Sequence, residues 1–220
     1  MHLLRIIANL EAENDILATD NHARSAQRIY FKHDRMYKHH IARINYTTYD
    51  VRRGQETFNP STSHCNVMVL TGALDDSMDP NITHPFSYAR VLGIYHVNVV
   101  YAGPGMTDYQ PQRMNFLWVR WYRCIERILT GWGARRLDRL EFPPVAGEDA
   151  FGFIDPSDVL RCCHIIPAFS SGKVHEDGRG LSFCARDSSD WVAYYVNRWV
   201  HLISAIMVDA NPRPVLLIVT

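Results

Sequence analysis

The sequence predicts an α+β domain that is mainly β: a small curved antiparallel sheet or barrel, with an N-terminal helical segment and peripheral helices. Its 220 residues are 47% apolar and 21% charged, a composition that supports a folded domain with a buried core. Residues 1–43 are rich in Glu, Ala, Arg and Leu, which favour helix, whereas β-branched and aromatic residues become frequent after them. We therefore expect a helical segment at 1–43, a mainly β domain at 44–200 with its core at 64–169, and an atypical tail at 201–220.

Helical spacing of apolar residues supports the N-terminal segment. The apolar positions are Leu3, Ile7, Leu10 and Leu17, and later Ile29, Met36, Tyr37 and Ile41, which we expect to be buried. Acidic residues at 11, 13 and 15 interrupt any apolar core of a secretory signal. The apolar run at 199–208 is about half the length that a membrane-spanning helix needs. The expected location is therefore nuclear or cytoplasmic, without secretion or membrane insertion.

The β region divides into six candidate strands separated by turn residues. The candidates are residues 46–50, 66–70, 88–101, 115–123, 136–142 and 163–168. The run at 88–101 exceeds the usual strand length, so Gly93 is expected to mark a bulge or a barrel corner. Pro156 stands where a proline begins a short helix, which predicts a helix at 157–161 before the last strand.

The strand at 115–123 has two chemically different faces. Period two places Leu117, Val119 and Trp121 on one face. The other face carries Phe116, Trp118, Arg120 and Tyr122. Burying an unpaired arginine is costly, so the first face is expected to point inward, together with Val91 and Ile165. Trp118, Arg120 and Tyr122 are then expected to be partly exposed.

The net charge of zero conceals two basic segments. Residues 24–53 hold eight basic residues against two acidic ones, and residues 113–139 hold seven arginines against two acidic residues. Two basic faces on a neutral body indicate a polyanion or an acidic partner. The alternative is that the arginines are solvated and pair with local carboxylates.

Signatures of catalysis and of cofactor or metal binding are not recognised in the sequence. It contains no nucleophile elbow, phosphate-binding loop or H-E-x-x-H helix. The acidic residues at 75–79 imitate a calcium loop, but Pro80 replaces the turn glycine, and neighbouring Cys162 and Cys163 cannot form a C-x-x-C site. Five cysteines without paired spacing indicate reduced thiols. We expect no enzymatic activity, no cofactor and solvated histidines at 33, 39 and 40.

Seven strings carry a resemblance to a known family. In order they are FKHDRMYKHH (31–40), INYTTYDVRR (44–53), HPFSYAR (84–90), FLWVRW (116–121), AFGFIDP (150–156), HIIPAF (164–169), and DW (190–191) with YYVNR (194–198). Over residues 28–200 the chain resembles the C-terminal region of Plavaka-type transposon proteins of mushroom-forming fungi. In such proteins the nuclease core lies upstream, so the resemblance implies a non-catalytic tail of a transposase-like protein. The similarity ends after Trp199.

At a looser level, residues 64–169 are similar to a bromo-adjacent homology (BAH) domain, which implies a BAH-like barrel. Two functional classes remain, and the first is a weak nucleic-acid or chromatin-binding module. Its expected phosphate contacts are Arg113, Arg120, Arg123, Arg127, Arg135 and Arg136. Trp118 and Tyr122 would stack on bases or line a cage for a methylated lysine. The second class is a structural protein-interaction domain that packed on a transposase core; an unrecognised enzyme is a weaker third.

Overall fold

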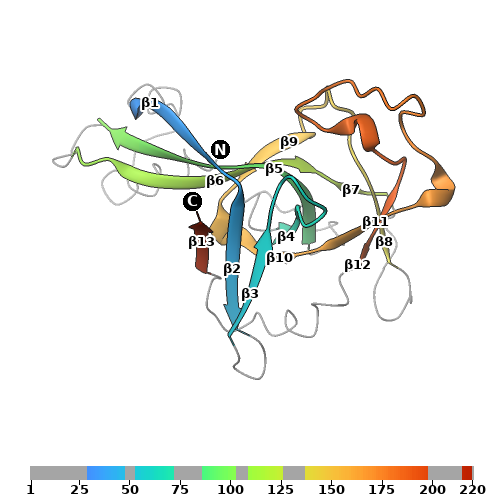
Figure 1. Cartoon of the computed structure of the whole chain (residues 1–220), viewed down its shortest axis with the longest axis horizontal. Coiled ribbons are helices and arrows are strands. Elements are labelled where there is room, and N and C mark those ends of the chain that lie inside the picture. Colours follow the sequence, from blue (N-terminus) through green and yellow to red (C-terminus); the bar gives the residue numbers. More distant parts are fainter. Residues whose placement is uncertain are drawn as a thin grey trace, which may run out of the picture.

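The computed structural model describes residues 29–47, 53–71, 86–102, 109–125, 137–197 and 215–219. These residues form antiparallel strands and three short 3-10 turns (Figure 1). The strands are β1 (Ile29–His39), β2 (Ile41–Thr47), β3 (Arg53–Phe58), β4 (Asn66–Leu70), β5 (Phe86–Tyr101), β6 (Gln112–Trp121), β7 (Arg123–Cys124), β8 (Asp138–Glu141), β9 (Phe151–Ile154), β10 (Val159–Cys162), β11 (His164–Pro167), β12 (Tyr194–Asn197) and β13 (Val215–Val219). The turns are Pro156–Asp158, Phe169–Ser171 and Asp187–Ser189.

The central sheet has six strands in the order β10-β4-β5-β6-β9, with β1 paired to β5. The long strand β5 serves two neighbours: β4 pairs with its first residues and β1 with residues 94–101. The register of β5 against β6 shifts between Val91 and Gly93, which confirms the predicted bulge. A Cβ atom at position 93 would collide with the ring of Tyr95, which lies against the backbone, so glycine suits this position.

A smaller sheet packs on each face of the central sheet. On the first face, Val91, Leu117 and Val119 meet the three-stranded sheet β13-β2-β3 through Ile44 and Phe58. On the second face, Tyr88 and Tyr122 meet the four-stranded sheet β11-β12-β8-β7. That sheet contributes Leu140, Tyr194 and Val196. The molecule therefore has two apolar cores, separated by β4, β5 and β6.

The predicted strands are largely confirmed. The bounds of β4 coincide with the expected strand at 66–70, and β5 and β6 contain most of the expected strands at 88–101 and 115–123. Val91, Leu117 and Val119 are fully buried as expected, whereas Trp121 and Ile165 are partly buried at the edges of the two cores. Gly152 leaves the space that the Trp121 indole occupies.

The predicted helical segment is wrong where the structure describes it, since residues 29–39 and 41–47 are strands. Pairing with β5 and β3 satisfies the backbone of these residues, which overrides their helical composition. Met36 and Tyr37, expected in the core, are exposed. Residues 1–28 and the tail before residue 215 lie outside the described residues.

Two further corrections concern closure and helices. The sheets are antiparallel, as predicted, and of the two predicted forms the described strands adopt open sheets rather than a closed barrel. The short helix expected at 157–161 is a 3-10 turn, Pro156–Asp158, that runs directly into β10. The Asp155 carboxylate caps this turn by accepting a 2.7 Å hydrogen bond from the Ser157 backbone N–H. Because the Asp155 carboxylate already satisfies the Ser157 backbone N–H, a longer helix is not needed at this corner.

Candidate nucleic-acid interface

The predicted phosphate-binding arginines have different surroundings. Arg113 is exposed on β6 and its Nε donates a 3.1 Å hydrogen bond to Asn115 Oδ1. Arg123 is exposed, but Glu141 on the neighbouring strand β8 binds its guanidinium, with Nε 3.0 Å from Oε1. Arg120 is only 3% exposed. The other three, Arg127, Arg135 and Arg136, lie outside the described residues.

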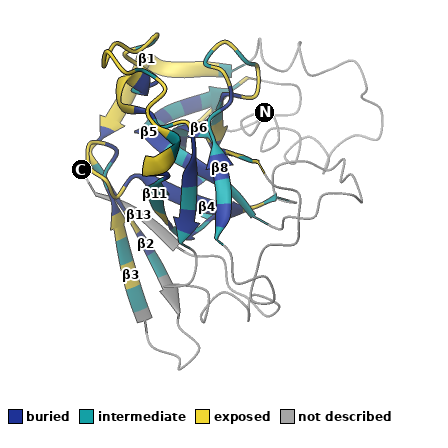
Figure 2. Ribbon diagram, turned by 90° about the vertical axis from the view of Figure 1, so that its right-hand side faces the viewer, coloured by how far each residue is buried: buried dark blue, intermediate teal, exposed yellow. Residues whose placement is uncertain are grey.

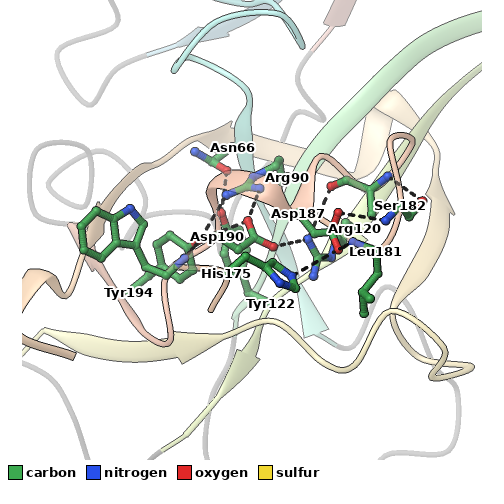
Figure 3. Close-up of polar contacts among 12 residues, drawn as sticks. Asn66, Arg90, Arg120, Tyr122, His175, Leu181, Ser182, Asp187, Asp190 and Tyr194 are labelled. Atoms are coloured by element: carbon green, nitrogen blue, oxygen red, sulfur yellow. Dashed lines mark hydrogen bonds and ion pairs between the residues drawn. The ribbon is translucent and has the colours of Figure 1, made fainter. Parts of the chain in front are cut away.

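Arg120 belongs to a buried ion cluster rather than to a surface. It stands opposite Arg90 in the register of β5 and β6, and both arginines reach the buried Asp190 carboxylate (Figure 3). Arg90 Nη1 lies 2.8 Å from Oδ1, Arg120 Nη1 donates to Oδ2, and the Tyr194 hydroxyl donates to Oδ1 at 3.2 Å. The expectation that Arg120 is exposed is therefore wrong, because the loop before β12 supplies a carboxylate that neutralises it.

Aromatic rings enclose the same two guanidinium groups. Tyr122 and Phe142 stack with centroids 4.1 Å apart. The Cζ atoms of Arg90 and Arg120 lie 4.4 and 3.9 Å from the Phe142 centroid. Burial disfavours the Arg90 charge, but the nearby Tyr122, Asp190 and Tyr194 outweigh this effect and raise its pKa. The rings thus form an aromatic cage whose cations come from the chain itself.

Arg90 and Arg120 already occupy the aromatic cage, and this determines whether Tyr122 and Trp118 can take the roles that were expected of them. Tyr122 is buried, its hydroxyl donates to Asn66 Oδ1 at 3.1 Å, and burial raises its pKa. It was expected to be exposed for stacking or for a methylated lysine, and that expectation is wrong. Trp118 is half-buried and stacks on Phe151, with ring centroids 6.1 Å apart. Its indole remains partly accessible to solvent.

The loop that carries Asp190 is held by a second buried carboxylate. Asp187 accepts hydrogen bonds from the backbone N–H groups of Leu181 and Ser182, at 2.7 and 3.1 Å (Figure 3). Burial would raise the pKa of Asp187, but these hydrogen bonds hold it below its ordinary value. Arg186 donates to the carbonyls of Pro60 and Leu92, which ties the loop to the central sheet. Both buried carboxylates therefore hold the fold together.

The first basic segment does form an exposed charged strip. Lys32, Arg35 and Lys38 on β1 and Arg43 on β2 are exposed, and none makes an ion pair with another described residue. Exposed apolar side chains are interleaved with them: Tyr30, Phe31, Met36 and Tyr37. Figure 2 shows β1 as a largely exposed strand at one end of the central sheet. Composition alone indicated a basic segment here but not its strand geometry.

The strand register brings the basic groups of β1 and β6 to one end of the sheet. The pairing of β1 with β5 shifts between Phe31 and Met36, so the bulge containing Lys32 and Arg35 lies opposite the region of Asn98. Asn98 in turn pairs with Arg113 on β6. Only one strand separates the two groups, which corresponds to about 10 Å between the outer backbones. Arg113 shares the first face with Asn115 and Leu117, whereas Lys38 stands beside Tyr95 on the second face. Lys32, Arg35, Lys38 and Arg113 are called the basic end below.

Two histidines fasten β1 to β5 next to the basic end. His39 is 4% exposed, and its Nε2 lies 2.6 Å from His96 Nδ1. The Tyr37 ring stacks on His96 at a centroid distance of 4.6 Å. Burial, followed by the positive charge of Arg113, lowers the pKa of both histidines. His39 was expected to be solvated, and no local pattern reveals its partner 57 residues away.

No known family model, curated protein or solved structure matches this chain significantly. Among the described residues, no group of three or more His, Cys, Asp or Glu side chains is placed to hold a metal ion. Within the same residues, no helix has the length and hydropathy of a membrane span. The structure describes all five cysteines, and none of them forms a disulfide.

Proposed function

We propose that this chain is a non-catalytic nucleic-acid-binding module that uses the basic end as its contact surface. The observation that carries the proposal is a set of exposed cations on β1 and β6 that no described carboxylate neutralises. Asp34 is the only acidic residue in β1. Such cations attract phosphates and release the counterions that surround them, which gives binding without sequence preference.

The resemblance to Plavaka-type transposon proteins agrees with this role. A tail that holds DNA or chromatin would assist a nuclease core located elsewhere in a transposase-like protein, without doing chemistry itself. Such a role places the protein in the nucleus. Of the six arginines expected to contact phosphate, Arg113 keeps that role here, Arg120 is buried, and Arg123 is already paired.

A salt titration tests the proposal directly. Fluorescence anisotropy of a labelled 20-nucleotide DNA should show binding that weakens with salt, with a log-log slope that becomes shallower by about one for each contacting cation removed. Lys32→Ala, Arg35→Ala and Arg113→Ala are the test variants, and Arg123→Ala is the matched control because Glu141 already binds this arginine. Undetectable binding at low salt, or a log-log slope that is unchanged in all three variants, would refute the proposal.

One observation favours a second function, a structural interaction domain that docks on a transposase core. Phe183 is 98% exposed and Leu181 is 80% exposed. Both lie on the loop that Asp187 and Arg186 hold against the body, so exposed apolar groups are presented on a fixed backbone. If this function is correct, Phe183→Ser should abolish association with a transposase core domain in analytical ultracentrifugation and leave DNA binding intact.

A further inference from the structure

We propose that the ligand of the basic end is single-stranded nucleic acid, whose unpaired bases stack on a row of aromatic side chains on the second face of the central sheet. The row consists of Tyr95 on β5, Phe116 on β6 and Phe153 on β9. The inference rests on the proposed function and deepens it, since exposed cations alone do not distinguish single strands from duplexes. The base-stacking surface is a separate feature with its own geometry.

The register of three adjacent strands builds the row. Tyr95 and Phe116 are direct partners across β5 and β6, and their rings stack with centroids 5.6 Å apart. Phe153 on β9 pairs with Trp118, the next residue on the same face of β6, and its ring meets the Phe116 ring edge-on, with centroids also 5.6 Å apart. Phe153 is 60% exposed, and the other two rings are half-buried. The outermost ring thus presents most of its surface to solvent.

A rigid platform supports these rings. On the opposite face of the same three strands, Ile94, Leu117 and Ile154 are buried in the first core. Gly93 allows the Tyr95 ring to lie against the sheet backbone, which fixes its orientation. Aromatic groups held in this way lose little conformational freedom when a base stacks on them. Arg120 lies on the same face, further along β6. There the four-stranded sheet and the loop before β12 cover the central sheet.

Charge identifies a nucleic acid rather than an apolar partner. Lys38 on β1 pairs with Tyr95 in the register, so an exposed ammonium group stands at the edge-strand end of the aromatic row. The bulge with Lys32 and Arg35 follows on the same strand. A row of three rings with an exposed cation at its end offers contacts to both the bases and the phosphates of a single strand. A protein segment that needed only apolar contacts would gain nothing from these cations.

Base accessibility selects the single strand. In a duplex the flat faces of the bases are stacked on one another, and only their edges are open in the grooves. A row of rings on an open sheet can reach base faces only when the bases are unpaired, as in known single-strand-binding domains. Each productive stack is expected to contribute about tenfold in affinity.

The experiment compares binding of dT20 and of a 20-base-pair duplex by fluorescence anisotropy at fixed low salt. We expect the single strand to bind at least tenfold more tightly, and Phe153→Ala to remove about tenfold from single-strand affinity without changing duplex affinity. Phe153→Leu keeps an apolar side chain and should lose the same affinity, which separates stacking from folding. Phe183→Ala is the matched control, because this phenylalanine is even more exposed, at 98%, and lies on the loop before β12, away from the aromatic row.

The possible failures are distinguishable. Equal affinity for both DNA forms, with no effect of either Phe153 variant, would overturn the stacking inference and leave the proposed function standing. Absence of binding to both forms at low salt would overturn the proposed function and this inference with it. Loss of affinity in Phe183→Ala as large as in Phe153→Ala would also contradict the assignment of the row.

Discussion

Arg120 shows how one carboxylate that is distant in the sequence determines whether a residue is buried. Taking a guanidinium out of water is costly, and the cost is met here by Asp190, by the Ala185 carbonyl and by the Phe142 ring. The Arg120 Nε atom still has no hydrogen-bond partner among the described residues. Such a cluster stabilises the fold less than its number of contacts suggests, but it penalises any arrangement that separates the partners.

Removal of the shared carboxylate should therefore be strongly destabilising. We expect Asp190→Ala to lower the free energy of unfolding by about 3 to 5 kcal/mol, because it leaves two buried guanidinium groups without their counter-charge. Urea denaturation followed by circular dichroism measures this loss. Glu141→Ala, which removes the carboxylate of an exposed ion pair, is the control and should have little effect. Similar losses in both variants would contradict the assignment of the cluster as buried.

Burial also separates the cysteines. Burial raises the pKa of Cys65, of Cys162 to about 12, and of Cys163, so these thiols stay protonated near neutral pH. Cys184 is exposed on the loop before β12. In native protein a maleimide should label Cys184 first, and peptide mass mapping identifies the site. Rapid labelling of Cys163 before unfolding would show that the second core is open.

For single residues, the sequence correctly predicted features that depend on one strand alone. It missed features that depend on contacts with a segment distant in the sequence. Alternation correctly placed Leu117 and Val119 in a core. The same argument put Arg120 outside because its partner Asp190 lies 70 residues further along the chain. The aromatic row was missed for the same reason: nothing near Phe116 in the sequence indicates that β9 will place Phe153 beside it.

Strand β1 is the element that composition misidentified. The helix was predicted from the Glu, Ala, Arg and Leu content of residues 1–43 as a whole, but 16-residue β5 extends beyond β4 and leaves one edge of its second half without a partner strand. β1 fills that edge, and the His39 hydrogen bond to His96 joins the two strands through side chains as well. Propensity is a weak guide where a long strand offers an unpaired edge.

The histidine pair predicts a pH dependence for this element. Both histidines have a pKa below the ordinary value of 6.5, so the unfolded chain binds protons more readily than the folded chain. Stability is therefore full above about pH 6.5 and falls as pH decreases through that value toward the lowered native pKa. Urea unfolding between about pH 5 and pH 8 measures the dependence.

A double variant isolates the contribution of the pair. His39→Gln with His96→Gln should reduce the loss of stability below pH 6.5, while His64→Gln, at an exposed position, should leave it unchanged. Hydrogen exchange should locate the acid-induced opening in residues 29–39. An identical pH dependence in wild type and double variant would show that the pair does not control the attachment of β1.

At the scale of the molecule, the central sheet is buried on both faces for part of its length and exposed at one end. β5 is buried almost continuously where both small sheets cover it, and half-buried positions become frequent beyond Ile94. Period-two reasoning assumes one solvent face, so it could predict the antiparallel sheet but not the second core. The covered part provides stability, and the uncovered end provides the proposed binding surface.

Because β5 and β6 contribute to both cores, we expect the two cores to unfold together. Leu117→Ala in the first core and Leu140→Ala in the second should each cost about 2 to 5 kcal/mol and shift a single urea transition. Both leucines are fully buried. Hydrogen exchange should then show amides of β2 and β3 losing protection at the same urea concentration as those of β8 and β12, in either variant. Val192→Ala, at an exposed position, is the control. If Leu140→Ala released β8 and β12 while β2 and β3 stayed protected, the cores would be independent units, and the long strands would connect them without coupling their stability.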